Sequence, residues 1–243
     1  MESIIAFEKV CKSYDEKTIL ENFSLNINKG EFVSIVGTSG SGKTTILRMI
    51  NGMIKPDSGR ITVMGEDLEN TNIIELRRKI GYAIQGNGLF PHMTASENIA
   101  YVPTISGAEK ARTDIIVDEM LDLVSLPKDI KNMMPRELSG GQQQRVGIAR
   151  AYANSPEILL MDEPFGAVDA ITRFELQKEL KEIYKKTGCT IVFITHDMGE
   201  ALKLGTKVLV LDKGQIQQFQ KPEEVAMRPA NEFVRRMVEM AKN

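Results

Sequence analysis

Short apolar runs between turn residues predict most of the strands of this 243-residue chain. Leu25-Asn26-Ile27 alternates apolar and polar side chains, as a half-buried strand does, whereas Phe32-Val33-Ser34-Ile35-Val36 is typical of a fully buried strand. Turn residues such as Asn28-Lys29-Gly30 separate the predicted strands. The other predicted strands cover residues 4–10, 60–63, 80–84, 158–161, 190–195, 207–211 and 215–217, and the last two form a hairpin.

Longer segments have the 3.6-residue periodicity of helices. Within residues 108–124 the apolar positions at this spacing are Ile115, Ile116, Met120, Leu121, Leu123 and Val124. Thr94 and Glu97 have the spacing of a capping box, which predicts that a helix begins there. The other predicted helices cover residues 45–50, 73–79, 137–153, 171–186, 222–227 and 231–241. Since about 87–155 contains no clear strand, we predict one α/β domain: a core formed by residues 1–86 and 156–243, and a helical subdomain over 87–155.

Composition and charge exclude several classes of protein. The hydrophobic content of 42% and the charged content of 26% are those of an ordinary globular protein. No apolar run approaches the ~18 residues that span a bilayer, and the N-terminus lacks the layout of a signal peptide, so we expect a cytoplasmic location. A net charge of −2 argues against nucleic acid as a partner. Cys11 and Cys189 have no metal-ligand spacing, and we expect both to be reduced and buried.

A glycine-rich segment directly after the buried strand 32–36 predicts a phosphate-binding loop. Its residues are Gly37, Thr38, Ser39, Gly40, Ser41, Gly42, Lys43 and Thr44, which fit the pattern G-x-x-x-x-G-K-[ST]. A predicted helix that begins at Thr45 follows, so backbone N–H groups and the helix N-terminus point at one anion. Lys43 can reach the β- and γ-phosphates of a nucleotide, and the Thr44 hydroxyl can bind Mg²⁺.

Polar residues follow three of the predicted core strands. Asp162 and Glu163 end an apolar strand, where an aspartate can hold Mg²⁺ and a glutamate can polarise an attacking water. Gln85 and His196 end two other strands. Because ligands of open α/β sheets bind beyond the carboxyl ends of the strands, we expect Gln85, Glu163 and His196 to converge on one pocket. Taken alone, a histidine such as His196 is more often a structural one.

A second glycine turn, Leu138-Ser139-Gly140-Gly141-Gln142, lies at the start of the predicted helix of residues 137–153. It supplies N–H groups at a helix N-terminus and therefore a second candidate anion site. One nucleotide does not need two phosphate-binding turns far apart in one chain. Two chains arranged head to tail do, because each turn then completes the other chain's site.

Together these segments resemble the ATP-binding cassette (ABC) ATPases over about residues 4–225, since the motifs occur in the family's order. The resemblance identifies residues 37–44 as the Walker A motif, Gln85 as the Q-loop glutamine, 138–142 as the signature, 158–162 as the Walker B motif, Glu163 as the catalytic glutamate and 195–197 as the segment of the switch histidine. Asp169 lies in the place of the D-loop, where Ala167-Val168-Asp169 departs from the more usual Ala-Leu-Asp. By its residues alone Tyr14 is a partly exposed loop aromatic, and the resemblance makes it the aromatic that stacks on adenine.

The family implies a fold, cofactors and a dimer. We expect a P-loop NTPase core of ABC ATPase type with an antiparallel β subdomain and an inserted α-helical subdomain. ATP and Mg²⁺ are the implied cofactors, with Thr44, Gln85 and Asp162 as metal contacts and 139–142 on the nucleotide of a second copy. The implied partners are that second copy and integral membrane permease subunits, with a substrate-binding protein acting indirectly. The implied location is the cytoplasmic face of the cell membrane.

Finer similarity points to importers of quaternary amine osmoprotectants such as glycine betaine, choline and carnitine. It rests on residues 75–82, 88–94, 137–144, 193–198 and 231–234. Residues 89–94 fall where the family receives a permease coupling helix, although Leu89 and Met93 are also consistent with the subdomain core. Gln85-Gly86-Asn87 departs from the more usual second glutamine or similar polar residue there. Many members of this branch append two regulatory CBS modules, and the sequence ends at Asn243, so we expect that regulation to be absent or to lie elsewhere. An ATPase of an amino-acid importer, or a nucleotide switch that does not transport, remains the alternative.

Overall fold

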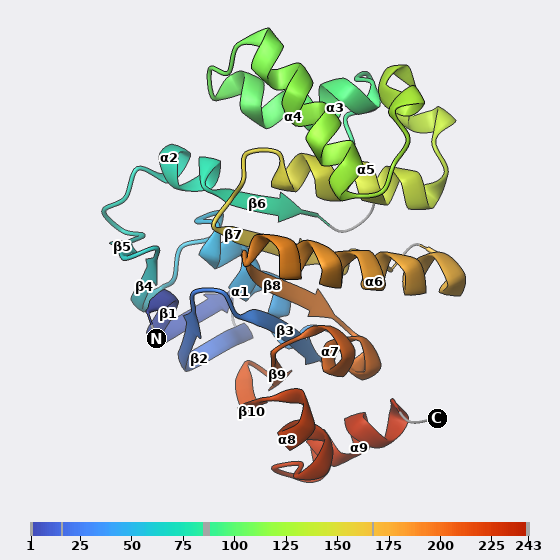
Figure 1. The fold of residues 1–243 in the computed structure, drawn as a ribbon. Helices are drawn as coiled ribbons and strands as arrows, with labels where there is room; N and C mark the ends of the chain where they lie inside the picture. The colour runs from blue at the N-terminus through green and yellow to red at the C-terminus, as the bar shows by residue number, and fades with distance from the viewer. Residues whose placement is uncertain (1, 16, 85–87, 167, 242–243) are drawn as a thin grey trace. The chain divides into compact units, whose positions relative to one another are not determined.

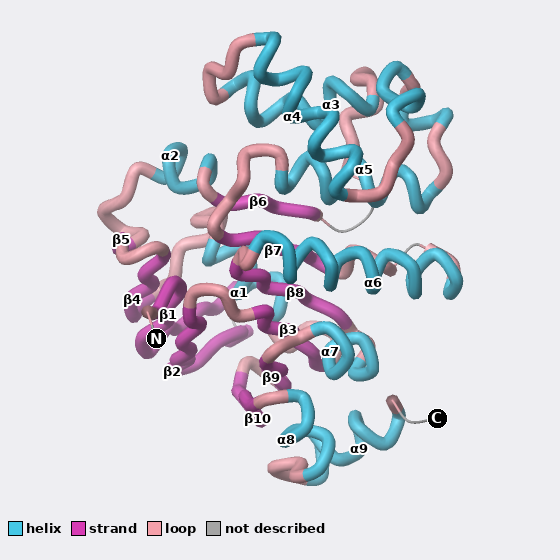
Figure 2. Tube along the Cα trace, viewed as in Figure 1, coloured by secondary structure: helices cyan, strands magenta, loops and turns pink. Residues whose placement is uncertain are grey.

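The chain divides into two units, one formed by residues 1–77 and 190–243 and the other by residues 78–189. The computed structural model describes residues 2–15, 17–84, 88–166 and 168–241 (Figures 1 and 2). Gln85, Gly86 and Asn87 of the predicted Q-loop, and Ala167 of the predicted D-loop, lie outside the described residues. None of the described helices is both long enough and apolar enough to cross a membrane.

An antiparallel sheet forms one part of the first unit. Its strands run in the order β2-β1-β4-β5, and they are β1 (Ser3–Tyr14), β2 (Lys17–Asn28), β4 (Ser58–Val63) and β5 (Glu66–Asp67). Phe7 and Phe23 pack edge to face on the hairpin β1–β2, with ring centroids 5.5 Å apart. Both strands of the hairpin are longer than predicted, because charged residues at their outer ends hide the alternation. The prediction that Tyr14 lies in a loop is wrong: it ends β1 opposite Lys17.

A mainly parallel sheet forms the centre of this unit. Its strands run in the order β10-β9-β3-β8, and they are β10 (Gln215–Gln220), β9 (Lys207–Asp212), β3 (Phe32–Gly37) and β8 (Thr190–Thr195). β3 pairs in parallel with both β8 and β9. Every residue of β3 and of β8 is buried, which explains why both strands read as nearly continuous apolar runs.

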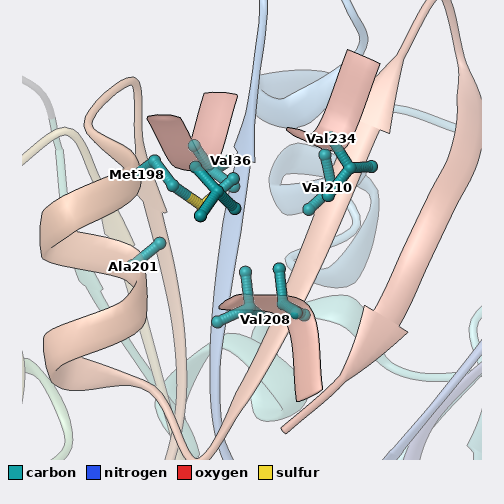
Figure 3. Close-up of a cluster of buried hydrophobic side chains, with 8 residues drawn as sticks. Val36, Met198, Ala201, Val208, Val210 and Val234 are labelled. Atoms are coloured by element: carbon teal, nitrogen blue, oxygen red, sulfur yellow. The ribbon is translucent and has the colours of Figure 1, made fainter. Parts of the chain in front are cut away.

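Helices complete the first unit (Figure 1). They are α1 (Lys43–Ile50), α2 (Ile73–Arg78), α7 (Met198–Leu204), α8 (Pro222–Met227) and α9 (Glu232–Met240). A buried cluster joins α7, α8 and α9 to the sheet, and Figure 3 shows Met198 and Ala201 of α7 beside Val36 of β3. Sequence periodicity missed α7, because seven residues complete only two helical turns.

Helices also make up most of the second unit. They are α3 (Ala95–Ile105), α4 (Lys110–Leu123), α5 (Gly140–Tyr152) and α6 (Ala170–Thr187), with the short 3-10 helices η1 (Lys128–Asn132) and η2 (Pro135–Glu137). β6 (Ile80–Ala83) and β7 (Ile158–Asp162) pair in parallel. No described residue between these two strands forms another strand.

Local sequence signals place one helix start of this unit correctly and another only approximately. The predicted capping box is confirmed, since Thr94 Oγ1 accepts a hydrogen bond from the N–H of Glu97, whose side chain returns to Thr94 N–H. α5 begins three residues later than predicted, because Pro135–Glu137 forms a 3-10 turn.

The buried face of α4 differs from the predicted one. Ile115, predicted among the apolar positions of α4, is 51% exposed, and Val117 is buried in its place.

The two cysteines have different surroundings. Cys11 is only half-buried, so the expectation of two buried thiols is wrong for this residue. The N–H of Asn22 donates to Cys11 Sγ at 3.4 Å, and this bond with one from Ser58 lowers the pKa of the Cys11 thiol. Burial raises the pKa of Cys189 to about 12, and its thiol donates to the carbonyl oxygen of Pro156.

We therefore expect one reactive thiol in the folded protein at pH 8. Thiolate is the reactive form of cysteine, so Cys11 is expected to react with a disulfide reagent. Cys189 is expected to react only after unfolding, because pH 8 lies far below its pKa and the thiol stays protonated. The measurement is the number of thiols modified with and without denaturant. Cys11→Ser is the control and should leave no fast-reacting thiol in the native chain. Rapid modification of native Cys11→Ser would contradict the assignment.

Candidate functional site

The segment between β3 and α1 forms a tight loop around the ammonium group of Lys43. Gly40 and Gly42 have φ angles of +75° and +101°, a region that favours glycine. Lys43 Nζ donates to the carbonyl oxygens of Gly37 and Thr38, both at 2.9 Å. The positive charge is thereby held inside the loop.

The turn between β9 and β10 supports the same loop. A Cβ atom at Gly37 would lie 2.0 Å from the carbonyl oxygen of Leu211, so only glycine fits there. Thr38 Oγ1 donates to Asp212 Oδ1 at 3.0 Å, and the N–H of Gly214 donates to the carbonyl oxygen of Ser41 at 3.1 Å. The residues that hold the loop in place through these contacts lie about 170 positions later in the sequence.

The start of α1 fits an anion. Gly42 is its N-cap, and no side chain caps the helix. The first N–H groups of a helix lack partners within the helix, and the helix dipole favours negative charge there. Thr44 and Thr45 are half-buried in this first turn. The loop and α1 therefore have the donors and the charge that a polyphosphate needs.

The tip of the β1–β2 hairpin lies against this loop. The side chains of Ile19 and Leu20 come within 3.3 and 3.1 Å of where a Cβ of Gly42 would be. Lys17 Nζ lies 4.0 Å from where a Cβ of Gly40 would be. Sequence reasoning missed Lys17, because only the folded hairpin places this charge beside the loop. Tyr14, opposite Lys17 and 44% exposed, is available to stack on a planar base.

His196 lies at the same edge of the parallel sheet as the loop. Val36 of β3 pairs in parallel with Thr195 of β8, so Gly37 and His196 follow equivalent positions on neighbouring strands. The His196 side chain is exposed at this strand end. The first unit thus brings together Tyr14, the residues 37–45 and His196.

In the second unit, Asp162 and Glu163 follow one another at the end of β7. Asp162 is 5% exposed. Glu163 has a φ angle of +44°, in the left-handed region. Such a conformation costs a non-glycine residue about 1–3 kcal/mol and is concentrated at functional sites. The N–H of Gly166 donates to the carbonyl oxygen of Glu163, which closes the turn that holds this conformation.

The signature segment forms the N-terminus of α5. Ser139 is the N-cap: its hydroxyl accepts from the N–H of Gln142 at 3.2 Å, while Gln142 Oε1 accepts from the N–H of Ser139 at 2.9 Å. Gly140 is exposed, and a Cβ atom there would meet nothing within 4 Å. The turn therefore presents backbone N–H groups at its glycines, while each of its two polar side chains accepts from the backbone N–H of the other residue.

Asp169 caps the next helix and lies close to the signature. Its Oδ1 accepts from the N–H groups of Ile171 and Thr172, and its Oδ2 accepts from the Thr172 hydroxyl at 2.7 Å. These bonds lower the pKa of Asp169, and the bond from the Thr172 hydroxyl contributes most. The methyl group of Thr172 lies 2.7 Å from where a Cβ of Gly141 would be. The second unit thus joins the signature and D-loop segments through Thr172.

A methyl group added at Gly141 should destabilise the protein. Gly141→Ala places a Cβ against the stiff, β-branched Thr172, and we expect a loss of about 1–3 kcal/mol in the free energy of unfolding. Gly140→Ala, one residue away in open space, is the matched control and should leave stability unchanged or raise it. Thr172→Ser in the Gly141→Ala background removes the clashing methyl and should restore most of the loss. Equal unfolding midpoints for Gly140→Ala and Gly141→Ala in urea would contradict this packing.

Comparison with known proteins gives consistent matches. The ABC transporter family model matches residues 20–166. The glycine betaine uptake system ATP-binding protein YehX of Escherichia coli (strain K12) is 46% identical over 232 residues, which cover 96% of this chain and 75% of the relative. The glycine betaine/carnitine/choline transport ATP-binding protein OpuCA of Bacillus subtilis (strain 168) is 46% identical, over 97% of this chain but only 62% of the relative.

A solved structure agrees with the fold. It is described as a dimeric structure of a post-hydrolysis state of the ATP-binding cassette MJ0796 bound to ADP and Pi. It matches with a TM-score of 0.81 and 35% identity, covering 90% of this chain and 98% of that chain. The predicted P-loop NTPase fold of ABC ATPase type is confirmed. The chain belongs to the ABC transporter family, as an ATP-binding cassette ATPase.

Proposed function

We propose that this protein is the ATP-hydrolysing subunit of an importer for quaternary amines such as glycine betaine, choline or carnitine. The observation that carries the ATPase part is that one chain contains two candidate phosphate-binding elements. They are the loop around Lys43 and the exposed glycine turn that begins α5. The names of the relatives support the solute class. The solute itself is expected to contact the permease and a substrate-binding protein, not this subunit.

Two copies are expected to close around two ATP molecules. In each site, residues 37–45 of one chain hold the phosphates and Tyr14 stacks on the adenine, while Ser139, Gly140, Gly141 and Gln142 of the other chain cover the γ-phosphate. Asp169 would contact the nucleotide from the same side as this turn, since Thr172 links the two. A dimeric relative bound to ADP and Pi supports this arrangement.

The described side chains can divide the hydrolysis between them. Glu163 is a general base for the attacking water, held by its turn in one orientation. Lys43 neutralises phosphate charge, and His196 holds the γ-phosphate from the neighbouring strand end. Thr44 and Asp162 would supply the hydroxyl and carboxylate oxygens that suit Mg²⁺, which would neutralise phosphate charge, and Gln85 would complete this set.

The segment after Gln85 is a candidate docking site for the permease. Asn98 is fully buried, and its amide donates to the carbonyl oxygens of Phe90, Met93 and Thr94. Arg150, from the last turn of α5, donates to the carbonyl oxygen of Gly88 at 2.8 Å, and its guanidinium lies 5.1 Å from the Phe90 ring centroid. The loop 88–94 is therefore rigid, as a surface that receives a partner should be. Docking there places the protein at the cytoplasmic face of the membrane.

Replacing the proposed base should separate ATP binding from hydrolysis. Glu163→Gln keeps the side-chain shape but accepts no proton, so the ATPase rate should fall by at least ~100-fold. ATP binding should persist and the protein should accumulate as a dimer, measured by light scattering with and without ATP. Glu119→Gln, exposed on α4, is the control and should leave the rate unchanged. Full ATPase activity in Glu163→Gln would refute the role of Glu163.

Isolation of the intact complex tests the partner and the solute. The tagged chain, purified from detergent-solubilised membranes of its own cells, should carry integral membrane subunits with it. Deleting its gene should abolish uptake of labelled glycine betaine, choline or carnitine, while amino-acid uptake continues. Migration with ribosomes or DNA would refute the transport role. Loss of amino-acid uptake alone would refute the quaternary amine.

A further inference from the structure

A closed ring of hydrogen bonds links the two residues that flank His196, Thr195 and Asp197, with Glu200. Thr195 Oγ1 donates to Glu200 Oε2 at 2.6 Å and accepts from the N–H of Asp197 at 3.0 Å. Asp197 Oδ1 in turn accepts from the N–H of Glu200 at 3.1 Å. The three bonds join the residues on both sides of His196 to the first turn of α7.

This ring is a capping box with one group inserted. Asp197 is the N-cap of α7, and Glu200 is the third residue of the helix. In an ordinary capping box the glutamate side chain accepts directly from the N–H of the N-cap residue. Here the Thr195 hydroxyl stands between them, since it accepts a hydrogen bond from the Asp197 N–H and donates one to the Glu200 carboxylate. The insertion ties the helix start to the last residue of β8.

Two members of the ring, Thr195 and Glu200, are held in the core. Thr195 and Glu200 are 2% and 8% exposed. Thr195 pairs with Val36, and Figure 3 shows Met198 and Ala201, on either side of Glu200 in sequence, packed beside Val36. The carboxyl group therefore cannot move away without disturbing a buried helix. A buried hydroxyl–carboxyl bond of 2.6 Å is short, which is typical of the stronger hydrogen bonds in proteins.

We propose that Glu200 is a positioning residue for hydrolysis, acting on His196 through the Thr195 hydroxyl. The inference rests on the proposed role of His196. The ring holds the peptide group after His196 through the Asp197 N–H, while the pairing of Thr195 with Val36 holds the strand before it, and together they fix the backbone that carries the exposed His196 side chain. Without the Thr195 oxygen, the Asp197 N–H loses its acceptor and the peptide at His196 can rotate. A displacement of about 1 Å in a catalytic group can lower a rate ~100-fold.

Two threonines of the same strand provide a matched test. Thr190, at the other end of β8, is 1% exposed and its hydroxyl accepts from the N–H of Gly30 at 2.9 Å. Thr195→Val and Thr190→Val each remove one buried hydroxyl from β8 and should lower the melting temperature. Only Thr195→Val should lower kcat for ATP, by about tenfold or more, with the KM for ATP changed less than about twofold. Equal kcat values for the two variants would overturn the proposal.

Conservative variants separate positioning from general loss of stability. Thr195→Ser keeps the hydroxyl, and Glu200→Gln keeps an oxygen that accepts from it, so both should retain most of kcat. Glu200→Leu keeps the volume without the acceptor, and its kcat should fall as in Thr195→Val. Wild-type kcat in folded Glu200→Leu would overturn the proposal.

His196→Ala, measured beside these variants in the full chain, tells two kinds of failure apart. If His196→Ala hydrolyses ATP normally, the role of His196 fails and the inference fails with it. If His196→Ala is inactive while Thr195→Val keeps its kcat, the role of His196 stands and the positioning inference is wrong. Loss of kcat in both, with ATP affinity retained, supports both.

Discussion

The first unit depends on the burial of β3 between two parallel neighbours. Its backbone is paired on both sides and its side chains are buried on both faces, so the strand end is a fixed point. The phosphate loop begins at that point, and the β9–β10 turn and the β1–β2 hairpin both press against it. A ligand with several negative charges is bound best by donors that need no rearrangement. The buried strand supplies that rigidity.

The helices that carry candidate residues differ in one informative respect. α5, α6 and α7 are capped by the side chains of Ser139, Asp169 and Asp197. α1 has a glycine at its N-cap and no side-chain cap. A side-chain cap satisfies part of the helix start internally, whereas a glycine leaves room for a ligand to approach the backbone. The start of α1 is thus open to direct phosphate contact at its cap, and the capped start of α5 still presents its exposed glycine turn, whereas the capped starts of α6 and α7 hold neighbouring groups in position.

Local signals explain how much of the site could be predicted. The glycines of the phosphate loop, the apolar run before Asp162, the capping box at Thr94 and the glycine turn of residues 138–142 each act over a few residues, so they are readable in order along the chain. The full lengths of β1 and β2 were not readable, because pairing between the strands extends them into charged, half-exposed segments. The outward position of Ile115 was missed for a similar reason, since the packing partners of α4 decide which of its apolar residues are buried.

The sequence by itself determined the family, the phosphate loop and the strand ends that carry Asp162, Glu163 and His196, because these depend on residue types at short, fixed spacings. Only the tertiary structure placed Lys17 beside Gly40, the Thr172 methyl against Gly141, and the Thr195 hydroxyl between Glu200 and the Asp197 N–H. Each of these depends on how a strand, turn or helix is oriented against another, and neither periodicity nor a motif specifies that orientation. The residues proposed to do the chemistry were therefore visible in the sequence, whereas several that are proposed to position them emerged only from the fold.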